Sequence, residues 1–145
     1  MIYIANVLFS KLLFIGMHGI KIRFSRWVPF DDILDYADEK AGVYEIRMKD
    51  GRKFGRVRGE SDIVYIGSTT KSFKSRFSGY MKPNRTQKTN KHVKWFSTKY
   101  EIEVAFLPIE KPRFYESLLI DTYIADHDEL PPLNHQSINK FHFKR

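Results

Sequence analysis

The sequence predicts an α+β fold in which a small antiparallel or mixed β-sheet is flanked by helices. Three observations lead to this prediction. Short runs of alternating apolar and polar residues, typical of half-buried strands, occur between residues 19 and 107. Helical patterns separate these runs and follow the last of them. The chain has 145 residues, of which 42% are hydrophobic, so its length and composition suit one domain with a single core.

We interpret residues 1–40 as an N-terminal extension that packs on the main domain. Its first 17 residues are mainly apolar, but polar residues interrupt them and they are fewer than the roughly 20 that a membrane-spanning helix needs. We therefore expect a buried strand or helix and no membrane partner, and Met17 is an alternative start of the protein. Residues 19–30 predict a strand and residues 31–40 a short helix.

The main domain is predicted to span residues 41–135 and to begin with a β-hairpin. Its first strand is expected at residues 42–48, and the Asp50-Gly51 pair that follows is a turn signal. The return strand is expected at residues 63–66. The segment between the two strands is basic, and we expect it to extend the hairpin into solvent as a finger.

A helix is predicted after the hairpin. Ser72 has the residue type and position of an N-cap, and the apolar stripe behind it continues to about residue 81. The polar, basic residues 82–95 are interpreted as a loop, with a helical turn near residues 93–96 as the only regular structure.

The last predicted elements are a strand at residues 102–107 and a helix that Pro112 begins. This helix is expected to continue to about residue 125, since two prolines soon after it block further helix. Residues 136–145 form a basic, aromatic tail.

Composition limits the classes of function. The chain has 25 Lys and Arg against 17 Asp and Glu, and its net charge of +8 favours a polyanionic partner, of which nucleic acid is the commonest. It has no cysteine, which excludes disulfides and thiolate zinc sites. The same absence allows a reducing compartment, and we expect a cytoplasmic protein.

Six polar side chains are candidates for chemistry because of their order along the chain. Two tyrosines lie on the predicted hairpin strands, an arginine and a tyrosine share a helix face four residues apart, and a glutamate and an asparagine follow. Taken singly, each has an ordinary structural explanation, such as packing or surface solvation. The six are Tyr44, Tyr65, Arg76, Tyr80, Glu116 and Asn134.

The combination resembles the GIY-YIG nuclease family. Gly-Val-Tyr ends at Tyr44, Tyr-Ile-Gly begins at Tyr65, and the arginine helix, Glu-Ser-Leu-Leu-Ile and Leu-Asn follow in the family's order. The resemblance covers about residues 42–134 and implies a GIY-YIG endonuclease-like fold and phosphodiester hydrolysis. Val43 replaces the family's isoleucine, and the two tyrosines are farther apart than in the compact form.

The resemblance implies a metal ion and an arginine as the charged groups of the site. Glu116 falls on the family's metal-binding glutamate, and one carboxylate with waters and a phosphate oxygen suits Mg²⁺, with Mn²⁺ as a possible substitute. Arg76 is expected to contact the scissile phosphate, because a guanidinium matches two phosphate oxygens and stays charged.

The remaining family positions are polar groups around the same phosphate. Tyr44 is expected to act as general base for the attacking water and Tyr65 to position it, although the residues alone leave open which phenol takes the proton. Tyr80 is expected to hydrogen-bond within this group. Asn134 is expected to tie the last segment to the site and is the most structural of the set. Gly67 is expected to permit close approach of backbone and DNA.

Further basic residues are expected to bind DNA phosphates without sequence preference. They are Lys71, which occupies a position where family members often carry a lysine; Arg52, Lys53, Arg56 and Arg58 in the hairpin; and Lys88, Lys91 and Lys94 in the predicted loop. His92 is the one nearby candidate for a histidine that some members use, and its spacing matches poorly.

Two alternatives to a self-sufficient DNA endonuclease remain open. The fold could serve as a non-catalytic nucleic-acid-binding module, although a metal carboxylate would have no purpose in such a clamp. The chain could also be a nuclease subunit whose specificity comes from a separate protein partner, because no separate sequence-reading motif occurs in it.

Overall fold

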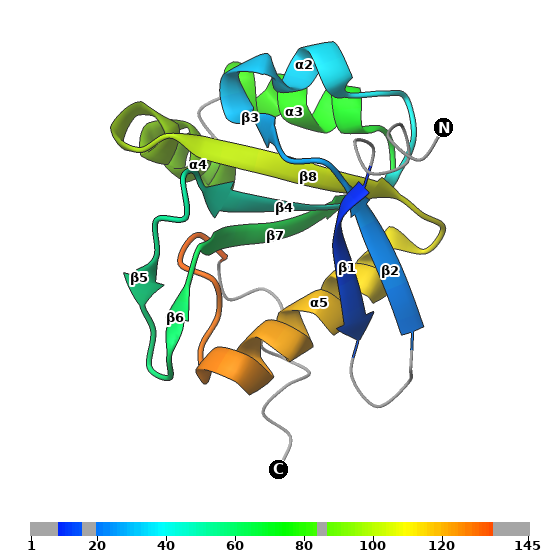
Figure 1. The fold of residues 1–145 in the computed structure, drawn as a ribbon. Helices are drawn as coiled ribbons and strands as arrows, with labels where there is room; N and C mark the ends of the chain where they lie inside the picture. The colour runs from blue at the N-terminus through cyan, green and yellow to red at the C-terminus, as the bar shows by residue number, and fades with distance from the viewer. Residues whose placement is uncertain (1–8, 16–19, 84–86, 135–145) are drawn as a thin grey trace, which may run out of the picture.

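The computed structural model describes residues 9–15, 20–83 and 87–134 (Figure 1). The predicted basic tail therefore lies outside the described residues. In chain order the elements are β1 (Phe9–Ile15), β2 (Ile20–Ser25), β3 (Val28–Pro29), a 3-10 turn (Phe30–Asp32), α2 (Ile33–Tyr36), β4 (Gly42–Met48), β5 (Phe54–Gly55), β6 (Glu60–Ser61), β7 (Ile63–Thr69), α3 (Phe73–Met81), α4 (Lys88–Lys99), β8 (Ile102–Pro108) and α5 (Pro112–His127).

The centre of the fold is a four-stranded antiparallel sheet with the strand order β3-β8-β4-β7. β4 lies between β7 and β8 and pairs with both along most of its length. The predicted strands at residues 42–48 and 102–107 are confirmed, and the return strand is longer than predicted because it continues to Thr69.

Helices cover both faces of this sheet (Figure 1). On one face, buried side chains of α3 and α4 join those of β4 and β8 in a core that is rich in aromatic rings. On the other face, Leu119, Ile120 and Tyr123 of α5 pack against Val43 and Ile66 of the sheet. The predicted α+β fold with a small antiparallel sheet flanked by helices is confirmed at this level.

The N-terminal segment takes part in the same cores. Ile22 and Phe24 of β2 are buried in the cluster that α5 forms, and β3 is one of the two edge strands of the central sheet. The short helix predicted to reach residue 40 is wrong in extent: α2 has 4 residues, since Ala37 already has an extended backbone. β1 pairs with β2 in a separate antiparallel hairpin.

Between β4 and β7 the chain makes the predicted turn and then a second, small hairpin. Asp50 and Gly51 both have positive φ angles, and Arg52 N–H donates to the Lys49 carbonyl, as in a type I′ turn. β5 and β6 then pair as a two-stranded ribbon.

α3 begins as predicted, whereas α4 corrects a prediction. Ser72 Oγ accepts a hydrogen bond from Ser75 N–H at 3.1 Å and so caps α3. Residues 88–99 form a helix of 12 residues where a loop was predicted. Its buried residues are only Asn90 and Val93, so the apolar period in this lysine-rich segment is too weak to indicate a helix.

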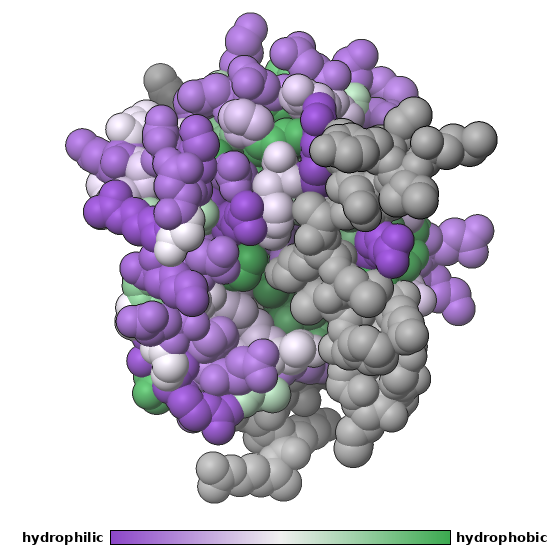
Figure 2. Space-filling view, in the orientation of Figure 1, coloured by the Kyte–Doolittle hydropathy of each residue, from purple (hydrophilic) through white to green (hydrophobic). Residues whose placement is uncertain are grey.

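The described surface is mainly hydrophilic on the face that Figure 2 shows, with hydrophobic residues in small areas between polar ones. Within the described segments, none of the helices combines the length and the hydrophobicity needed to cross a bilayer.

Candidate functional site

The two tyrosines of the sequence motifs lie side by side on β4 and β7. Tyr44 pairs with Gly67 across the strands, and the ring centroids of Tyr44 and Tyr65 are 6.0 Å apart. A Cβ atom at position 67 would lie 2.6 Å from atoms of both rings. Glycine is therefore required here because the phenol rings cover its backbone, and the approach of DNA is not needed to explain it.

α3 brings Arg76 and Tyr80 onto the same tyrosine. The Tyr44 and Tyr80 hydroxyl oxygens are 2.5 Å apart, and Arg76 Nε donates to Tyr44 Oη at 2.9 Å. The Arg76 guanidinium carbon is 5.0 Å from the Tyr80 ring centroid. The three side chains form one polar cluster beneath the helix, and Tyr65 touches it through its ring, 6.4 Å from that of Tyr80.

The tyrosines of this cluster are held in the neutral form. Tyr44 and Tyr80 are fully buried, and burial raises the pKa of each phenol far above its ordinary value. Burial also disfavours the charged form of Arg76, but the interactions with Tyr44 and Tyr80 outweigh this effect and leave the Arg76 pKa above its ordinary value. The cluster thus carries a fixed positive charge.

Glu116 reaches the same region from α5, on the other side of β7. Ser68 Oγ donates to Glu116 Oε2 at 2.5 Å. Burial raises the pKa of Glu116, while the Ser68 hydrogen bond and the charges of Arg76 and Arg113 offset this rise in part. Glu116 lies next to the same pocket as Arg76, because Ser68, its hydrogen-bond donor, lines that pocket together with Arg76.

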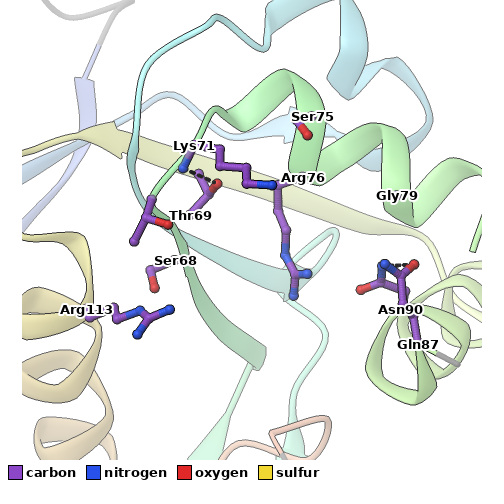
Figure 3. A pocket seen from close by; sticks show the side chains of 10 residues that line it. Ser68, Thr69, Lys71, Ser75, Arg76, Gly79, Gln87, Asn90 and Arg113 are labelled. Carbon is purple, nitrogen blue, oxygen red and sulfur yellow. Dashed lines mark hydrogen bonds between the residues drawn. The ribbon is translucent and has the colours of Figure 1, made fainter.

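A polar pocket of about 300 Å³ opens above these groups (Figure 3). It is walled by the end of β7 and the turn after it, by α3, by the start of α4 and by the start of α5. Arg113 and Arg76 lie on opposite sides of Ser68, and the Lys71 side chain extends toward Arg76. The lining residues are Ser68, Thr69, Thr70, Lys71, Ser75, Arg76, Gly79, Gln87, Asn90 and Arg113.

The charged residues that line the pocket have one sign, although the Glu116 carboxylate lies next to it. Three of its lining residues are cationic and none is a carboxylate, so the pocket attracts anions. Its walls offer hydroxyl and amide groups as further hydrogen-bond partners. This is the chemistry that a phosphate group requires.

Asn134 is bound to β7 rather than to the pocket. Its Nδ2 donates to the Ile66 carbonyl at 2.8 Å and its Oδ1 accepts from Ile66 N–H at 2.9 Å. Leu133 N–H also donates to the Val64 carbonyl, so this segment pairs with the outer edge of β7. Asn134 therefore holds the strand that carries Tyr65.

The basic residues of the hairpin lie at the opposite end of β7. The β5–β6 ribbon precedes this strand and the pocket follows it, which separates them by about 20 Å for a strand of this length. Arg56 Nη2 donates to the Leu130 carbonyl at 2.5 Å, and Arg58 Nε donates to the Asp126 carbonyl at 3.0 Å. The ribbon packs on the end of α5 and does not extend freely into solvent.

The other two hairpin cations also have neighbours within the protein. The Arg52 guanidinium stacks over the Tyr100 ring at 5.1 Å, and Lys53 lines a depression that contains Glu60 and Asp62. That these residues bind phosphates stays a prediction.

The remaining predicted DNA-binding residues lie on or near the pocket. Lys71 lines it directly. Lys88, Lys91 and Lys94 lie on α4, the helix whose first residues form one wall, and their contact with DNA stays a prediction. His92 is an exposed residue of the same helix and does not line the pocket.

Among the lining residues, sequence reasoning named only Lys71 and Arg76 and missed the rest, of which Arg113, Ser68 and Asn90 are three. Arg113 could have been found from its spacing, because it lies three residues before Glu116 in the same helix and so shares its face. Ser68 directly follows the Tyr-Ile-Gly motif, and the next alternation in the strand places it on the Glu116 side. Asn90 has no local signal, because its place in the pocket depends on the unpredicted α4.

Metal binding at this site would depend on one carboxylate. Among the described residues, no group of three or more His, Cys, Asp or Glu side chains converges to hold a metal ion. Glu116, which accepts a hydrogen bond from the pocket residue Ser68, is a half-buried carboxylate next to the pocket, and its role as a metal ligand stays a prediction.

The chain was compared with models of protein families, with curated proteins and with solved structures, and none of them matches it.

Proposed function

We propose that this protein is a Mg²⁺-dependent DNA endonuclease of the GIY-YIG type, which hydrolyses phosphodiester bonds. The observation that carries the proposal is the convergence of four separate segments on one cationic pocket. Arg76 of α3 lines this pocket. Tyr44 of β4 accepts a hydrogen bond from Arg76, Tyr65 of β7 packs against Tyr44, and Glu116 of α5 accepts one from the lining residue Ser68, in the residue types and chain order that resemble the family's motifs. The four-stranded sheet flanked by helices supports the finer assignment to a GIY-YIG fold.

The substrate class follows from charge. A phosphodiester is an anion, and three cations line the pocket with no opposing carboxylate on its walls. Arg76 is held in place by Tyr44 and keeps its charge, so it is ready to bind the scissile phosphate without rearrangement. The net charge of +8 supports binding of a long polyanion.

Glu116 suits a divalent cation. Burial raises the pKa of this carboxyl, which means that its charged form lacks full compensation in the protein alone. A bound cation would supply this compensation, and Ser68 orients the carboxylate for it. A single carboxylate suits Mg²⁺, or Mn²⁺ in its place, since Mg²⁺ retains several waters and takes phosphate oxygens as ligands. The ion would stabilise charge on the leaving oxygen.

The proton acceptor is better assigned to Tyr65 than to Tyr44. Tyr44 is fully buried, its hydroxyl contacts Arg76 and Tyr80, and burial raises its pKa. These features favour a neutral phenol that positions Arg76. Tyr65 is also buried, but at 7% it is the more exposed of the two and belongs to the same aromatic group, so we infer that it is the phenol nearer to solvent.

Nicking of supercoiled plasmid at low salt tests the proposal. Wild-type protein is incubated with Mg²⁺, Mn²⁺ or EDTA, and a band-shift assay measures binding to the same DNA. We expect nicking with either metal ion and none with EDTA. Binding without cleavage of plasmid, duplex or branched DNA would instead favour a nucleic-acid-binding module, and cleavage that requires an added protein would favour a partner-dependent subunit.

A further inference from the structure

Arg113 is the pocket cation to which the motif resemblance gives no role. It is the second residue of α5 and lies one helical turn before Glu116. Its side chain points from α5 toward Ser68, on the side of the pocket opposite Arg76 (Figure 3). Arg113 is exposed, whereas Arg76 is half-buried.

The fold itself does not use the charge of Arg113. In the described part of the chain, Arg113 forms no ion pair and no side-chain hydrogen bond, and its electrostatic effect on Glu116 is its one marked interaction. Other arginines have partners: Arg47 lies 2.9 Å from Glu103, and Arg56 lies 3.1 Å from Glu129. An exposed guanidinium that lines a pocket and forms no ion pair is available to an external anion, even with the Glu116 carboxylate nearby.

The number of cations exceeds what one phosphodiester requires. A phosphodiester carries a single negative charge, and Arg76 already supplies a fixed cation for it. One strand of a duplex carries one phosphate charge per nucleotide, about every 3.4 Å along the helix axis. A strand bound at Arg76 therefore brings further anions to this pocket, where Arg113 lies on the opposite side.

We propose that Arg113 binds the phosphate next to the scissile one, on the Glu116 side of the pocket. The inference rests on the proposed function, because it assumes that the scissile phosphate lies at Arg76. Arg113 then acts as a binding residue that fixes the path of the DNA strand over Ser68. It takes no part in proton transfer, so its loss weakens binding and raises KM more than it lowers kcat.

The test measures the affinity of a DNA duplex in EDTA by fluorescence anisotropy, at salt concentrations from about 50 to 200 mM. We expect Arg113→Ala to raise Kd about tenfold at low salt, as for loss of one charged hydrogen bond. The slope of log affinity against log salt should fall by about one, and Arg113→Lys should retain most of it. Arg26→Ala removes an exposed arginine outside the pocket and should leave the slope unchanged.

A second experiment locates the contact. Duplexes in which one phosphate at a time is replaced by a neutral methylphosphonate are bound by wild type and by Arg113→Ala. For one linkage, adjacent to the cleaved bond, we expect Arg113→Ala to bind the methylphosphonate duplex as tightly as wild type does. At that linkage the charge that Arg113 contacts is already absent from the DNA, so losing the arginine costs no further affinity.

The outcomes separate this inference from the proposed function. If wild type binds DNA but never cuts it, the nuclease fails while an altered salt slope for Arg113→Ala still supports the phosphate contact. If wild type cuts DNA and Arg113→Ala has an unchanged Kd and slope, the inference alone is overturned. An equal loss in Arg26→Ala, or no DNA binding by wild type, also overturns it.

Discussion

The arginines at the two ends of β7 differ in their partners within the protein. At the β5–β6 end, Arg56 and Arg58 lie next to carboxylates and donate to carbonyl oxygens at the end of α5. At the pocket end, Arg76 donates to a neutral phenol, and Arg113 has no ion-pair partner among the described residues. At the first end each arginine forms a salt bridge with a carboxylate, whereas at the second end Glu116 is the neighbouring carboxylate and neither arginine forms a salt bridge with it. We therefore expect the pocket end to bind an anionic substrate.

The largest contrast is expected when one arginine is removed from each end. Arg76→Ala should lower the nicking rate by at least about a hundredfold, because the scissile phosphate loses its fixed cation. Arg56→Ala should leave the rate per folded molecule nearly unchanged and instead destabilise the protein by about 1–3 kcal/mol, because the Leu130 carbonyl and the Glu129 carboxylate lose their partner. Nicking kinetics and urea unfolding measure the two effects.

Arg76→Lys is the matched variant for the first substitution, since it keeps the charge but not the planar fork. Loss of nicking in a folded Arg56→Ala variant, or a wild-type rate in Arg76→Ala, would contradict the claim that the pocket end of β7 binds the substrate.

The next effect concerns the two phenols. Tyr65→Phe should lower the rate of cleavage by about 10²–10⁴, the usual contribution of a general base. Tyr44→Phe should have a smaller effect on rate and should loosen Arg76, which loses its hydrogen-bond acceptor. Single-turnover rates across pH measure the difference. An equal or larger loss in Tyr44→Phe would return the role of base to Tyr44.

Packing around Gly67 gives a third effect, on stability. Gly67→Ala should destabilise the protein by about 1–3 kcal/mol, because the added carbon meets the rings of Tyr44 and Tyr65. Gly55→Ala on the β5–β6 ribbon is the control, since a Cβ there meets no atom within 4 Å. Chemical unfolding of the two variants measures the difference, and equal stability would show that the rings adjust without cost.

The smallest effect is the dependence of stability on pH at Glu116. Because burial raises the pKa of this carboxyl, the native state binds its proton more tightly than the unfolded state does. The tighter binding of this proton stabilises the native state fully below about pH 4, and this stabilisation is lost as the pH rises through the raised pKa. Glu116→Gln should therefore match wild type at low pH and become the more stable protein at neutral pH without metal.

Thermal unfolding at several pH values, with and without Mg²⁺, measures this difference. Added Mg²⁺ should stabilise wild type and leave Glu116→Gln unchanged. A variant that loses stability relative to wild type as the pH rises would contradict the sign of the shift.

Local patterns in the sequence predicted much of the fold. β4 and β8 alternate and pack on both sides, and α3 has both a cap at Ser72 and an apolar stripe, so these elements were predictable. α4 was not, because its stability comes from packing on α3: a Cβ at Gly79 would lie 3.1 Å from Asn90 Nδ2. A polar contact between two helices produces no hydrophobic periodicity in the sequence from which a helix could be predicted.

The site was predictable where residues follow a motif and unpredictable where partners are distant. The order of Tyr44, Tyr65, Arg76 and Glu116 pointed to a shared location. In the structure Arg76 bonds Tyr44, whose ring lies 6.0 Å from that of Tyr65, and Glu116 contacts the pocket residue Ser68. The pairing of Arg56 with residues more than 70 positions later in the chain could not be read locally. A count of basic residues therefore overestimated the free positive charge of the hairpin.

Metal-dependent nicking by wild type and Glu116→Gln, assayed side by side on supercoiled plasmid, tests the central claim most directly. The account predicts nicking by wild type with Mg²⁺, its loss in the variant by at least about a thousandfold, and similar DNA binding by both proteins. Wild-type activity in the folded variant, or cleavage by neither protein on DNA that both bind, would contradict it.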